Sequence, residues 1–355
     1  MKFIHIADVH IGAKPDAGFP WSEERGKEIL ESFAYIIDKC NEEEIDLLFI
    51  AGDLFHKQPL IRELKEVNYY FSKLHKTQVV IIVGNHDFVS PRSNYKGFLW
   101  NDNVHILLEE DLDSVYFEEI NTEVYGFSYH TREITEPRFH KIRPGCEERI
   151  NILLGHGGSL KNIPFDKKIL ETLGFDYIAL GHIHKPQMLS DRIAYPGSLE
   201  PIDKNEDGER GYIFGEISKN ETSEISLTFI PNSRRKYIKI SLEVNGNTTN
   251  GTISDQIKKE INNWGMEHIY VFTLTGNRDK DVKFHTEDFL RLGNIVEVID
   301  DTKPDYDFNH LQTENEDNII GLYIKKITEH EGDTLMIDKA LYYGMEALLV
   351  AKNYN

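Results

Sequence analysis

Cysteine is scarce in this chain, because Cys40 and Cys146 are the only two among its 355 residues. Two cysteines are too few for a disulfide framework, and their separation is not the spacing of a metal site. The sequence therefore excludes disulfide-stapled folds and thiolate metal centres. We predict that both side chains are ordinary packing residues.

Long hydrophobic runs are also missing. No stretch approaches the roughly 18 consecutive apolar residues that a membrane helix needs. The N-terminal residues Met1 to His5 run straight into a predicted strand and offer no cleavable signal segment. The sequence predicts a soluble cytoplasmic protein with no membrane partner.

Positive charge is in short supply, with 40 lysines and arginines against 60 acids and a formal net charge of −20. A protein that grips nucleic acid by its phosphates usually presents a basic face, so tight autonomous DNA binding is disfavoured. A nucleic-acid substrate is not excluded, because local basic clusters remain. A run of charged residues is usually a solvated face of the protein. We favour that interpretation slightly over one in which the clusters bind along a nucleic-acid backbone. The clusters are Arg132, Arg138, Lys141 and Arg143, and Arg234, Arg235, Lys236 and Lys239.

The length of the chain exceeds the usual size of a single domain. We predict a large N-terminal domain over residues 1–232, a small α/β capping domain over residues 233–300, and an acidic linker with a C-terminal segment over residues 301–355. In the capping domain, the patterns predict strands at residues 237–244 and 268–275 and helices at residues 254–264 and 286–292.

Strands and helices alternate in the first half of the chain. Runs dense in Ile, Val, Leu, Phe and Tyr predict buried strands at residues 3–7, 47–51, 79–83, 150–154 and 177–180. Helices are predicted at residues 22–43, with Ser22 as N-cap, at residues 62–75, and at residues 164–173. Pro91 is expected to open a further segment that ends near Trp100. Short alternating runs predict a strand meander over residues 104–129.

A polar signature directly follows each of the five predicted strands. Open α/β sheets commonly place ligand crevices at the C-terminal ends of their strands. Glycines precede four of the five signatures and are expected to let the backbone turn sharply there. We therefore expect the signatures to meet in one crevice. They are Asp8-x-His10, Gly52-Asp53, Gly84-Asn85-His86-Asp87, Gly155-His156 and Gly181-His182-x-His184.

Seven side chains of these signatures could hold two divalent cations. They supply two carboxylates, one amide oxygen and four imidazoles, which suit Mn, Fe or Zn better than the all-oxygen cages of Mg or Ca. Manganese is our first choice. A single Gly-His or Gly-Asp pair occurs by chance, whereas five signatures in order make a specific pattern. The predicted ligands are Asp8, His10, Asp53, Asn85, His156, His182 and His184.

In this order the signatures resemble those of the calcineurin-like metallophosphoesterase superfamily, over about residues 1–230. The resemblance implies an α/β (α+β) fold, a four-layer sandwich of two mixed β-sheets flanked by helices. It also implies hydrolysis of a phosphoester by in-line attack of water on phosphorus. Asp53 would bridge the two metals. One metal would be held by Asp8, His10, Asp53 and His184, and the other by Asp53, Asn85, His156 and His182.

Three further residues are predicted to act in catalysis. His86 matches the family histidine that is no ligand but stands beside the scissile phosphate, and Asp87 is expected to orient it. His56 adds a second histidine three residues after Asp53, and this pattern resembles that of the SbcD/YhaO-type DNA double-strand-break repair nucleases. We expect His56 to contact the substrate phosphate or, equally well, to support a metal ligand.

The leading hypothesis is a metal-dependent DNA repair nuclease, an exonuclease or endonuclease working with an SbcC-like coiled-coil ATPase. The resemblance also implies a homodimer through helices near residues 62–75 and 91–101, where core packing is the default interpretation of the aromatic residues. The alternative is a phosphodiesterase or phosphatase for a small nucleotide, which the acidic composition mildly favours. A third alternative is a non-catalytic metal-holding binding module, against which the complete ligand set argues.

Overall fold

The computed structural model describes residues 1–220, 222–330 and 332–353. The chain divides into two compact units. The first comprises Met1–Ile238 with Glu267–Ile269, and the second comprises Lys239–Met266 with Tyr270–Asn355. The three-part division at residues 232 and 300 stays a prediction.

The first sheet of the first unit has the strand order β12-β11-β1-β2-β3-β4 over the described residues. Strands β1 to β4 are parallel to one another, and β11 and β12 add an antiparallel edge. The mixed sheet is therefore built around the three N-terminal predicted strands. Its strands are β1 (Lys2–Ile6), β2 (Leu47–Ala51), β3 (Gln78–Ile82), β4 (Val104–Ile106), β11 (Gly211–Lys219) and β12 (Ser223–Pro231).

The second sheet has the order β5-β6-β7-β8-β10-β9. Its four inner strands are parallel, and β5 and β9 pair antiparallel at the two edges. The meander predicted over residues 104–129 is wrong, because β4 joins the first sheet and only β5 and β6 form a hairpin in the second. The strands are β5 (Asp113–Phe117), β6 (Thr122–Gly126), β7 (Ile150–His156), β8 (Tyr177–Gly181), β9 (Gln187–Ser190) and β10 (Ile193–Tyr195).

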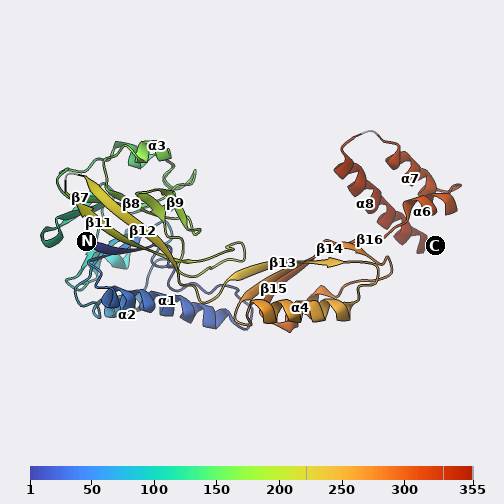
Figure 1. Ribbon diagram of the computed structural model, residues 1–355, viewed down its shortest axis with the longest axis horizontal. Helices are drawn as coiled ribbons and strands as arrows, with labels where there is room; N and C mark the ends of the chain where they lie inside the picture. Colours follow the sequence, from blue (N-terminus) through green and yellow to red (C-terminus); the bar gives the residue numbers. More distant parts are fainter. Residues whose placement is uncertain (221, 331, 354–355) are drawn as a thin grey trace. The chain divides into compact units, whose positions relative to one another are not determined.

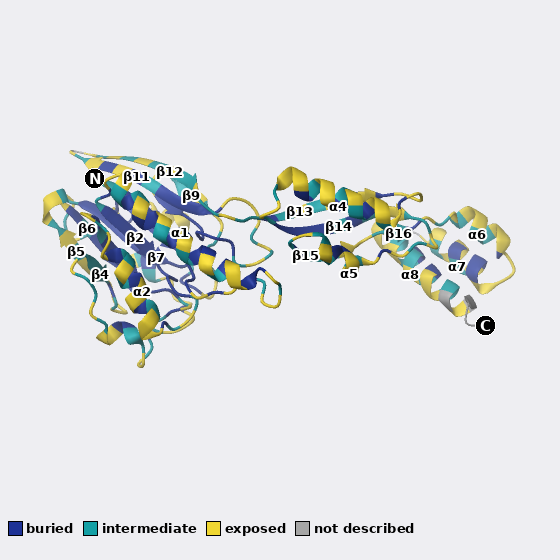
Figure 2. Cartoon of the chain, turned by 90° about the horizontal axis from the view of Figure 1, so that it is seen from below, coloured by how far each residue is buried: buried dark blue, intermediate teal, exposed yellow. Residues whose placement is uncertain are grey.

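Four layers result from three hydrophobic interfaces. Helices α1 (Ser22–Glu42) and α2 (Ile61–Phe71) cover the outer face of the first sheet, where Phe33 and Phe71 pack against its strands. A second core lies between the sheets. On the far side, Phe139 of the turn η3 (Arg138–Lys141) and Leu170 of α3 (Lys167–Leu170) cover the second sheet. Figure 1 shows α1 and α2 on one side of this unit and α3 on the other. Figure 2 shows the inner strands β2 and β7 buried, whereas the edge strands β9 and β12 are partly exposed. The predicted fold class is confirmed.

Several predicted helix limits are wrong. Trp21, not Ser22, is the N-cap of α1, and Ser22 is buried. Helix α2 ends at Phe71, and α3 has four residues only. Residues 91–101 hold just the 3₁₀ turn η1 (Asn94–Gly97). Side-chain bonds from this stretch to the backbone, such as Asn94 Nδ2 to the carbonyl of Pro59, support a loop in place of helical bonds.

The second unit contains a small sheet in the order β13-β14-β15, with β16 paired to β14. Helix α4 (Asn250–Trp264) buries Ile253, Ile257 and Ile261 at helical spacing. The stretch predicted to be an acidic linker contains β16 and α6. The strands are β13 (Tyr237–Val244), β14 (Ile269–Arg278), β15 (Ile295–Asp300) and β16 (Lys303–Pro304), and the remaining helices are α5 (Thr286–Phe289), η4 (Leu290–Leu292), α6 (Phe308–Glu314), α7 (Ile319–Thr328) and α8 (Thr334–Asn353). The turn η2 (Glu118–Ile120) belongs to the first unit.

None of the helices in the described ranges combines the length and the apolar character that crossing a membrane requires.

Candidate metal centre

The five signatures meet where β1, β2, β3, β7 and β8 end. Beyond β1 and β2 the two loops keep pairing through their backbones, with Asp8 N–H donating to the Gly52 carbonyl and His10 N–H to the Asp53 carbonyl, both at 3.1 Å. Four predicted ligands have a left-handed backbone: Asp8 (φ 50°), His10 (φ 54°), Asp53 (φ 50°) and His182 (φ 97°). Such conformations cost on the order of 1–2 kcal/mol each and are typical of functional sites.

The glycines of the signatures are needed mainly for close packing. Gly52 has the expected left-handed turn, with φ 90°. At Gly84 the reason is different, because a Cβ there would lie 2.2 Å from Asp53 Oδ1. At Gly181 a Cβ would lie 2.0 Å from the Ala51 carbonyl oxygen. Neither Gly84 nor Gly181 has a left-handed φ, and close contact between neighbouring strand ends explains both glycines.

One group of site residues forms around His156. The Ala51 carbonyl can only accept a hydrogen bond, so His156 donates to it from Nδ1 at 2.9 Å and presents Nε2 to the crevice. Nε2 lies 3.0 Å from Asn85 Oδ1 and 3.3 Å from Asp53 Oδ2. His182 Nδ1 lies 3.2 Å from the same Asn85 oxygen. Acceptor atoms that converge in this way suit a bound cation.

A second group forms around His184. Its Nε2 lies 3.1 Å from His10 Nε2 and 3.8 Å from Asp8 Oδ1. Asp8, His10 and His184 offer ligand atoms within 4.8 Å of one another, and so do Asp8, Asp53 and His156. Asp8 thus belongs to both groups, and the bridging role of Asp53 stays a prediction. The structure brings all seven predicted ligands into the crevice.

The electrostatics of the metal-free protein fit the same interpretation. Burial is the largest single influence on His156 and opposes its protonation, but the charge and hydrogen bond of Asp53, the charge of Asp8 and the Ala51 carbonyl together raise the pKa of His156 to about 9. Burial also raises the pKa of Asp8 to about 6, against the lowering effect of His184. Binding of a metal ion at His156 would therefore displace a proton.

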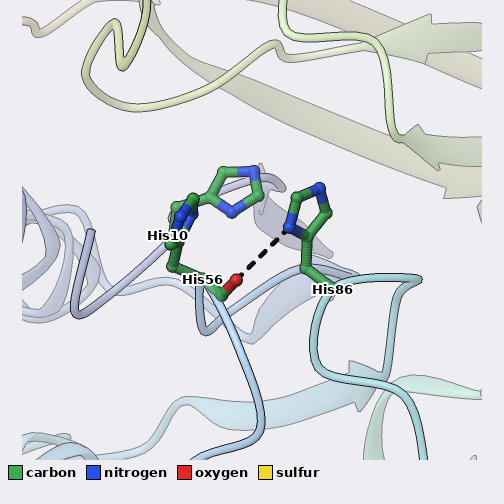
Figure 3. A group of neighbouring side chains, drawn as sticks. All are labelled: His10, His56 and His86. Carbon is green, nitrogen blue, oxygen red and sulfur yellow. Dashed lines mark hydrogen bonds between the residues drawn. The ribbon is translucent and has the colours of Figure 1, made fainter. Parts of the chain in front are cut away.

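The predicted catalytic histidines lie at the open side of this crevice. His86 is exposed, and its Nδ1 lies 3.3 Å from the carbonyl oxygen of His56 (Figure 3). The ring centroids of His10 and His86 are 4.8 Å apart, and those of His10 and His56 are 5.4 Å apart. The backbone N–H of His86 donates to Asp53 Oδ1 at 2.8 Å. The loop of His86 is thus tied to the metal ligands.

Asp87 has other partners than the ring of His86. Its carboxylate accepts hydrogen bonds from Gly84 N–H at 2.9 Å, Phe55 N–H at 3.2 Å and the Tyr95 hydroxyl at 2.7 Å. The expectation that Asp87 orients the imidazole is therefore corrected. The buried carboxylate holds the shape of the loop that carries Asn85 and His86.

Two polar partners of the ligands were missed by the sequence analysis. Glu206 Oε1 lies 2.6 Å from His184 Nδ1, and Ser159 Oγ lies 3.0 Å from His182 Nε2. Neither residue belongs to a signature, and Glu206 lies in the segment between β10 and β11. No spacing rule could have paired them with their histidines.

A pocket of about 420 Å³ opens beside His86. It is lined by Lys57 and Arg132 together with His56, Asn85 and His86. The structure divides the first basic cluster, because Arg138 is paired with Glu110 and lines another pocket with Lys141 and Arg143.

Ion pairs occupy three members of the second basic cluster. They link Arg234 to Glu31, Arg235 to Glu28, and Lys236 to Glu209. These contacts agree with a structural role for that cluster.

An α/β sandwich that gathers carboxylates and imidazoles at its strand ends, beside an exposed histidine, has the arrangement of a metal-dependent phosphoesterase. The sequence model of a family described as "Calcineurin-like phosphoesterase" matches residues 1–186, more than half of the chain. The chain belongs to this family and is a metallophosphoesterase, a hydrolase, as the signatures predict.

Two relatives are similar to the chain. One, from Bacillus subtilis (strain 168), is named "Uncharacterized metallophosphoesterase YhaO" and is 31% identical over 245 residues, which cover 63% of this chain and 59% of the relative. The other, from Methanocaldococcus jannaschii, is named "DNA double-strand break repair protein Mre11" and is 31% identical over 261 residues, which cover 68% of this chain and 70% of the relative. The chain thus matches less than two thirds of the length of the Bacillus relative.

Proposed function

We propose that this metallophosphoesterase is a DNA repair nuclease that hydrolyses phosphodiester bonds with two divalent metal ions. The observation that carries the proposal is the pocket beside His86, where Lys57 and Arg132 stand next to the predicted ligands. Two basic side chains in a pocket that also contains His86 and the predicted ligand Asn85 suit a substrate with more than one phosphate, although Glu133 lines the same pocket. The similarity to a relative named as a DNA double-strand break repair protein supports the same substrate class.

The side chains of the chain have distinct tasks in this proposal. Bound cations would supply Lewis acidity and lower the pKa of water. His86 is placed at the open side of the crevice, where it can donate a proton to the phosphate or to the leaving oxygen. His56 contacts the same phosphate, and Asp87 keeps the loop of His86 in shape. The residues that hold the cations are Asp8, His10, Asp53, Asn85, His156, His182 and His184.

Turnover tests decide between DNA and a small phosphoester. We expect the purified chain with Mn²⁺ to cleave linear and hairpin DNA faster than bis-p-nitrophenyl phosphate or cyclic nucleotides. The Asn85→Ala variant, which lacks one predicted ligand, should lose activity on all substrates. Hydrolysis of cyclic nucleotides without cleavage of DNA would favour the small-molecule phosphodiesterase, and two bound metal ions without any turnover would favour the binding module.

We also propose manganese as the native metal, since the mixed oxygen and imidazole donors suit it. Elemental analysis of the protein purified without added metal should find Mn in excess of Fe and Zn. A reconstitution series that gives the highest DNA cleavage with another ion would contradict this choice.

We propose an SbcC-like coiled-coil ATPase as a partner of the C-terminal helices. Several apolar side chains of α7 and α8 are exposed: Ile319 at 68%, Leu322 at 57%, Leu335 at 61%, Met336 at 70% and Tyr343 at 71%. Exposed apolar residues in such number are typical of a protein interface. Such an ATPase would also carry much of the DNA affinity that the acidic chain lacks. Leu335→Glu should abolish co-elution with the ATPase and leave phosphoesterase turnover unchanged.

A homodimer through α2 and residues 91–101 is proposed in addition. Tyr69 and Leu99 are 61% and 90% exposed in this region, whereas Phe71 and Tyr95 are buried in the core. Light scattering should give twice the mass of 41.2 kDa for the chain, and Tyr69→Glu should reduce it to the single mass. A single mass for the unaltered chain at micromolar concentration would contradict the dimer.

A further inference from the structure

We propose that Glu206 is a positioning residue of the metal centre, which fixes the orientation and the tautomer of His184 and so strengthens the binding of one of two divalent cations. The inference rests on the proposed two-metal site and concerns a residue outside the five signatures.

The contact between Glu206 and His184 sets the direction of the imidazole. Glu206 Oε1 lies 2.6 Å from His184 Nδ1. An ionised carboxylate can only accept a hydrogen bond, so Nδ1 of His184 carries the donated hydrogen. The lone pair of Nε2 then faces Asp8 Oδ1 at 3.8 Å and His10 Nε2 at 3.1 Å. This tautomer is the one that a metal ion between the three side chains needs.

Glu206 is itself held in place by its surroundings. Its second oxygen, Oε2, accepts the backbone N–H of Ile202 at 3.0 Å and lies 3.8 Å from Arg210 Nε. The Arg210 side chain is only 2% exposed and donates from Nη1 to the carbonyls of Asp207 at 2.9 Å and Glu209 at 2.8 Å. The guanidinium therefore braces the part of the loop that directly follows Glu206. A carboxylate fixed in this way holds its partner ring with little loss of side-chain entropy on metal binding.

Glu206 also distinguishes His184 from the other histidines of the crevice. His156 donates to the neutral carbonyl of Ala51, and His182 lies beside the neutral hydroxyl of Ser159. Among these three rings, only His184 has an anion as the partner of the ring nitrogen that points away from the other predicted ligands. A carboxylate partner makes the imidazole a stronger donor to a cation, and removal of such a partner typically costs about 10- to 100-fold in metal affinity. The loss should therefore fall on the cation next to His184.

The test is a Mn²⁺ titration of the 355-residue chain after removal of metal by a chelator. Isothermal calorimetry gives the two dissociation constants for the parent, Glu206→Gln and Glu206→Ala. We expect one site to weaken by about 10- to 100-fold in Glu206→Ala and the other to stay at the parental value. Glu206→Gln should lie between, because its amide oxygen still accepts the Nδ1 hydrogen but carries no charge. Glu209→Gln, which changes an exposed neighbour paired with Lys236, is the matched control and should bind like the parent.

The proposal is overturned if Glu206→Ala binds Mn²⁺ at both sites with the parental affinity. It is also overturned if the near-isosteric Glu206→Gln weakens both sites equally while its circular dichroism spectrum is unchanged. A parent that binds fewer than two ions overturns the metal centre and this inference together. A parent that binds two ions but cleaves no DNA contradicts only the proposed substrate, and the effect of Glu206 on binding remains measurable.

Discussion

The histidines of the crevice differ in the hydrogen-bond partners of their ring nitrogens. His156 is fixed by a carbonyl and His184 by a carboxylate, so that each can present the lone pair of Nε2 to a bound cation. His86 lacks such a fixed partner, since its ring reaches only the His56 carbonyl at 3.3 Å and is exposed. An exposed ring that can still turn suits proton donation to a substrate better than permanent ligation.

His86→Ala is therefore expected to lower kcat about 100- to 10,000-fold, the usual range for a lost general acid. Metal binding should stay at two ions, because His86 is not a predicted ligand. Steady-state turnover and metal analysis on the same sample measure the two effects. His75→Ala, at another exposed histidine, is the control, and loss of a metal ion from the His86 variant would show that His86 is a ligand.

At the scale of strands, the ends of β2, β3, β7 and β8 approach so closely that some positions have no room for a Cβ. The Cβ of an alanine at position 84 would lie 2.2 Å from Asp53 Oδ1. One of the two side chains must then move, and Asp53 is a predicted ligand of both metals. The glycines of the signatures are thus part of the metal site through packing as well as through backbone conformation.

Gly84→Ala should lower the affinity for Mn²⁺ at least about tenfold, an effect of the size seen when the support of a ligand is lost. Calorimetric titration of the metal-free protein measures it. Gly97→Ala is the matched control, because a Cβ at Gly97 meets nothing within 4 Å. Unchanged binding in Gly84→Ala would show that the loop relaxes without moving Asp53.

Helix α1 is anchored by a buried charge network. Arg25 pairs with Glu28 at 2.7 Å and Glu200 at 3.2 Å, and Arg235 pairs with Glu28 at 2.7 Å. Burial raises the pKa of Glu28, but the two arginines outweigh it and leave this pKa below the ordinary value of 4.5. A lowered folded-state pKa means that the stabilisation by Glu28 is present above about pH 4.5 and is lost as the pH falls through the lower folded value.

Glu28→Gln should reduce the free energy of unfolding by about 3 kcal/mol at pH 7, because it leaves Glu200 as the one carboxylate beside the buried Arg25 guanidinium and removes the charge that pairs with Arg235. The difference in the free energy of unfolding between the variant and the parent should shrink as the pH falls below about 4.5, because the glutamate of the unfolded chain then takes up a proton. Urea unfolding between pH 7 and pH 3.5 measures it. Glu24→Gln, at a surface pair with Lys27, should change stability by less than about 0.5 kcal/mol. A difference for Glu28→Gln that is the same at every pH would contradict the assigned role.

At the scale of the whole molecule, the predicted ligands all lie in the first of the two compact units. A ligand stabilises only the unit that binds it. Units with separate cores can unfold in separate transitions, so that metal binding identifies the transition of the unit that holds the site.

Calorimetry of the full chain should show two transitions, of which Mn²⁺ moves one. At a free Mn²⁺ concentration of about 100 times the dissociation constant, the bound ion adds about 2.7 kcal/mol to the free energy of unfolding. This raises the midpoint temperature of a unit of this size by roughly 5–10 °C. Chelator should reverse the shift, and Asn85→Ala should show a smaller one. Equal shifts of both transitions would contradict the assignment of the metal ions to the first unit.

Short-range patterns were enough to predict the five inner strands, the helix α1 and the family. Apolar runs of strand length and a helical spacing of Ile and Phe are local properties, and the order of the signatures is read along the chain. Helix ends were predicted less well. The stretch at residues 91–101 forms only a 3₁₀ turn, in which Tyr95 turns inward to Asp87, and that contact is decided by packing.

The sequence by itself therefore determined the class of fold, the metallophosphoesterase family and the types of donor atoms available for metal ions. Tertiary structure alone decided which oxygen fixes each histidine: Ala51, distant by 105 residues from His156, and Glu206, distant by 22 from His184. It also decided that Asp87 supports a loop and that Arg132 lines the pocket while Arg138 does not. The physical reason is that strand order and loop packing bring such pairs together, and neither follows from the periodicity of a single segment.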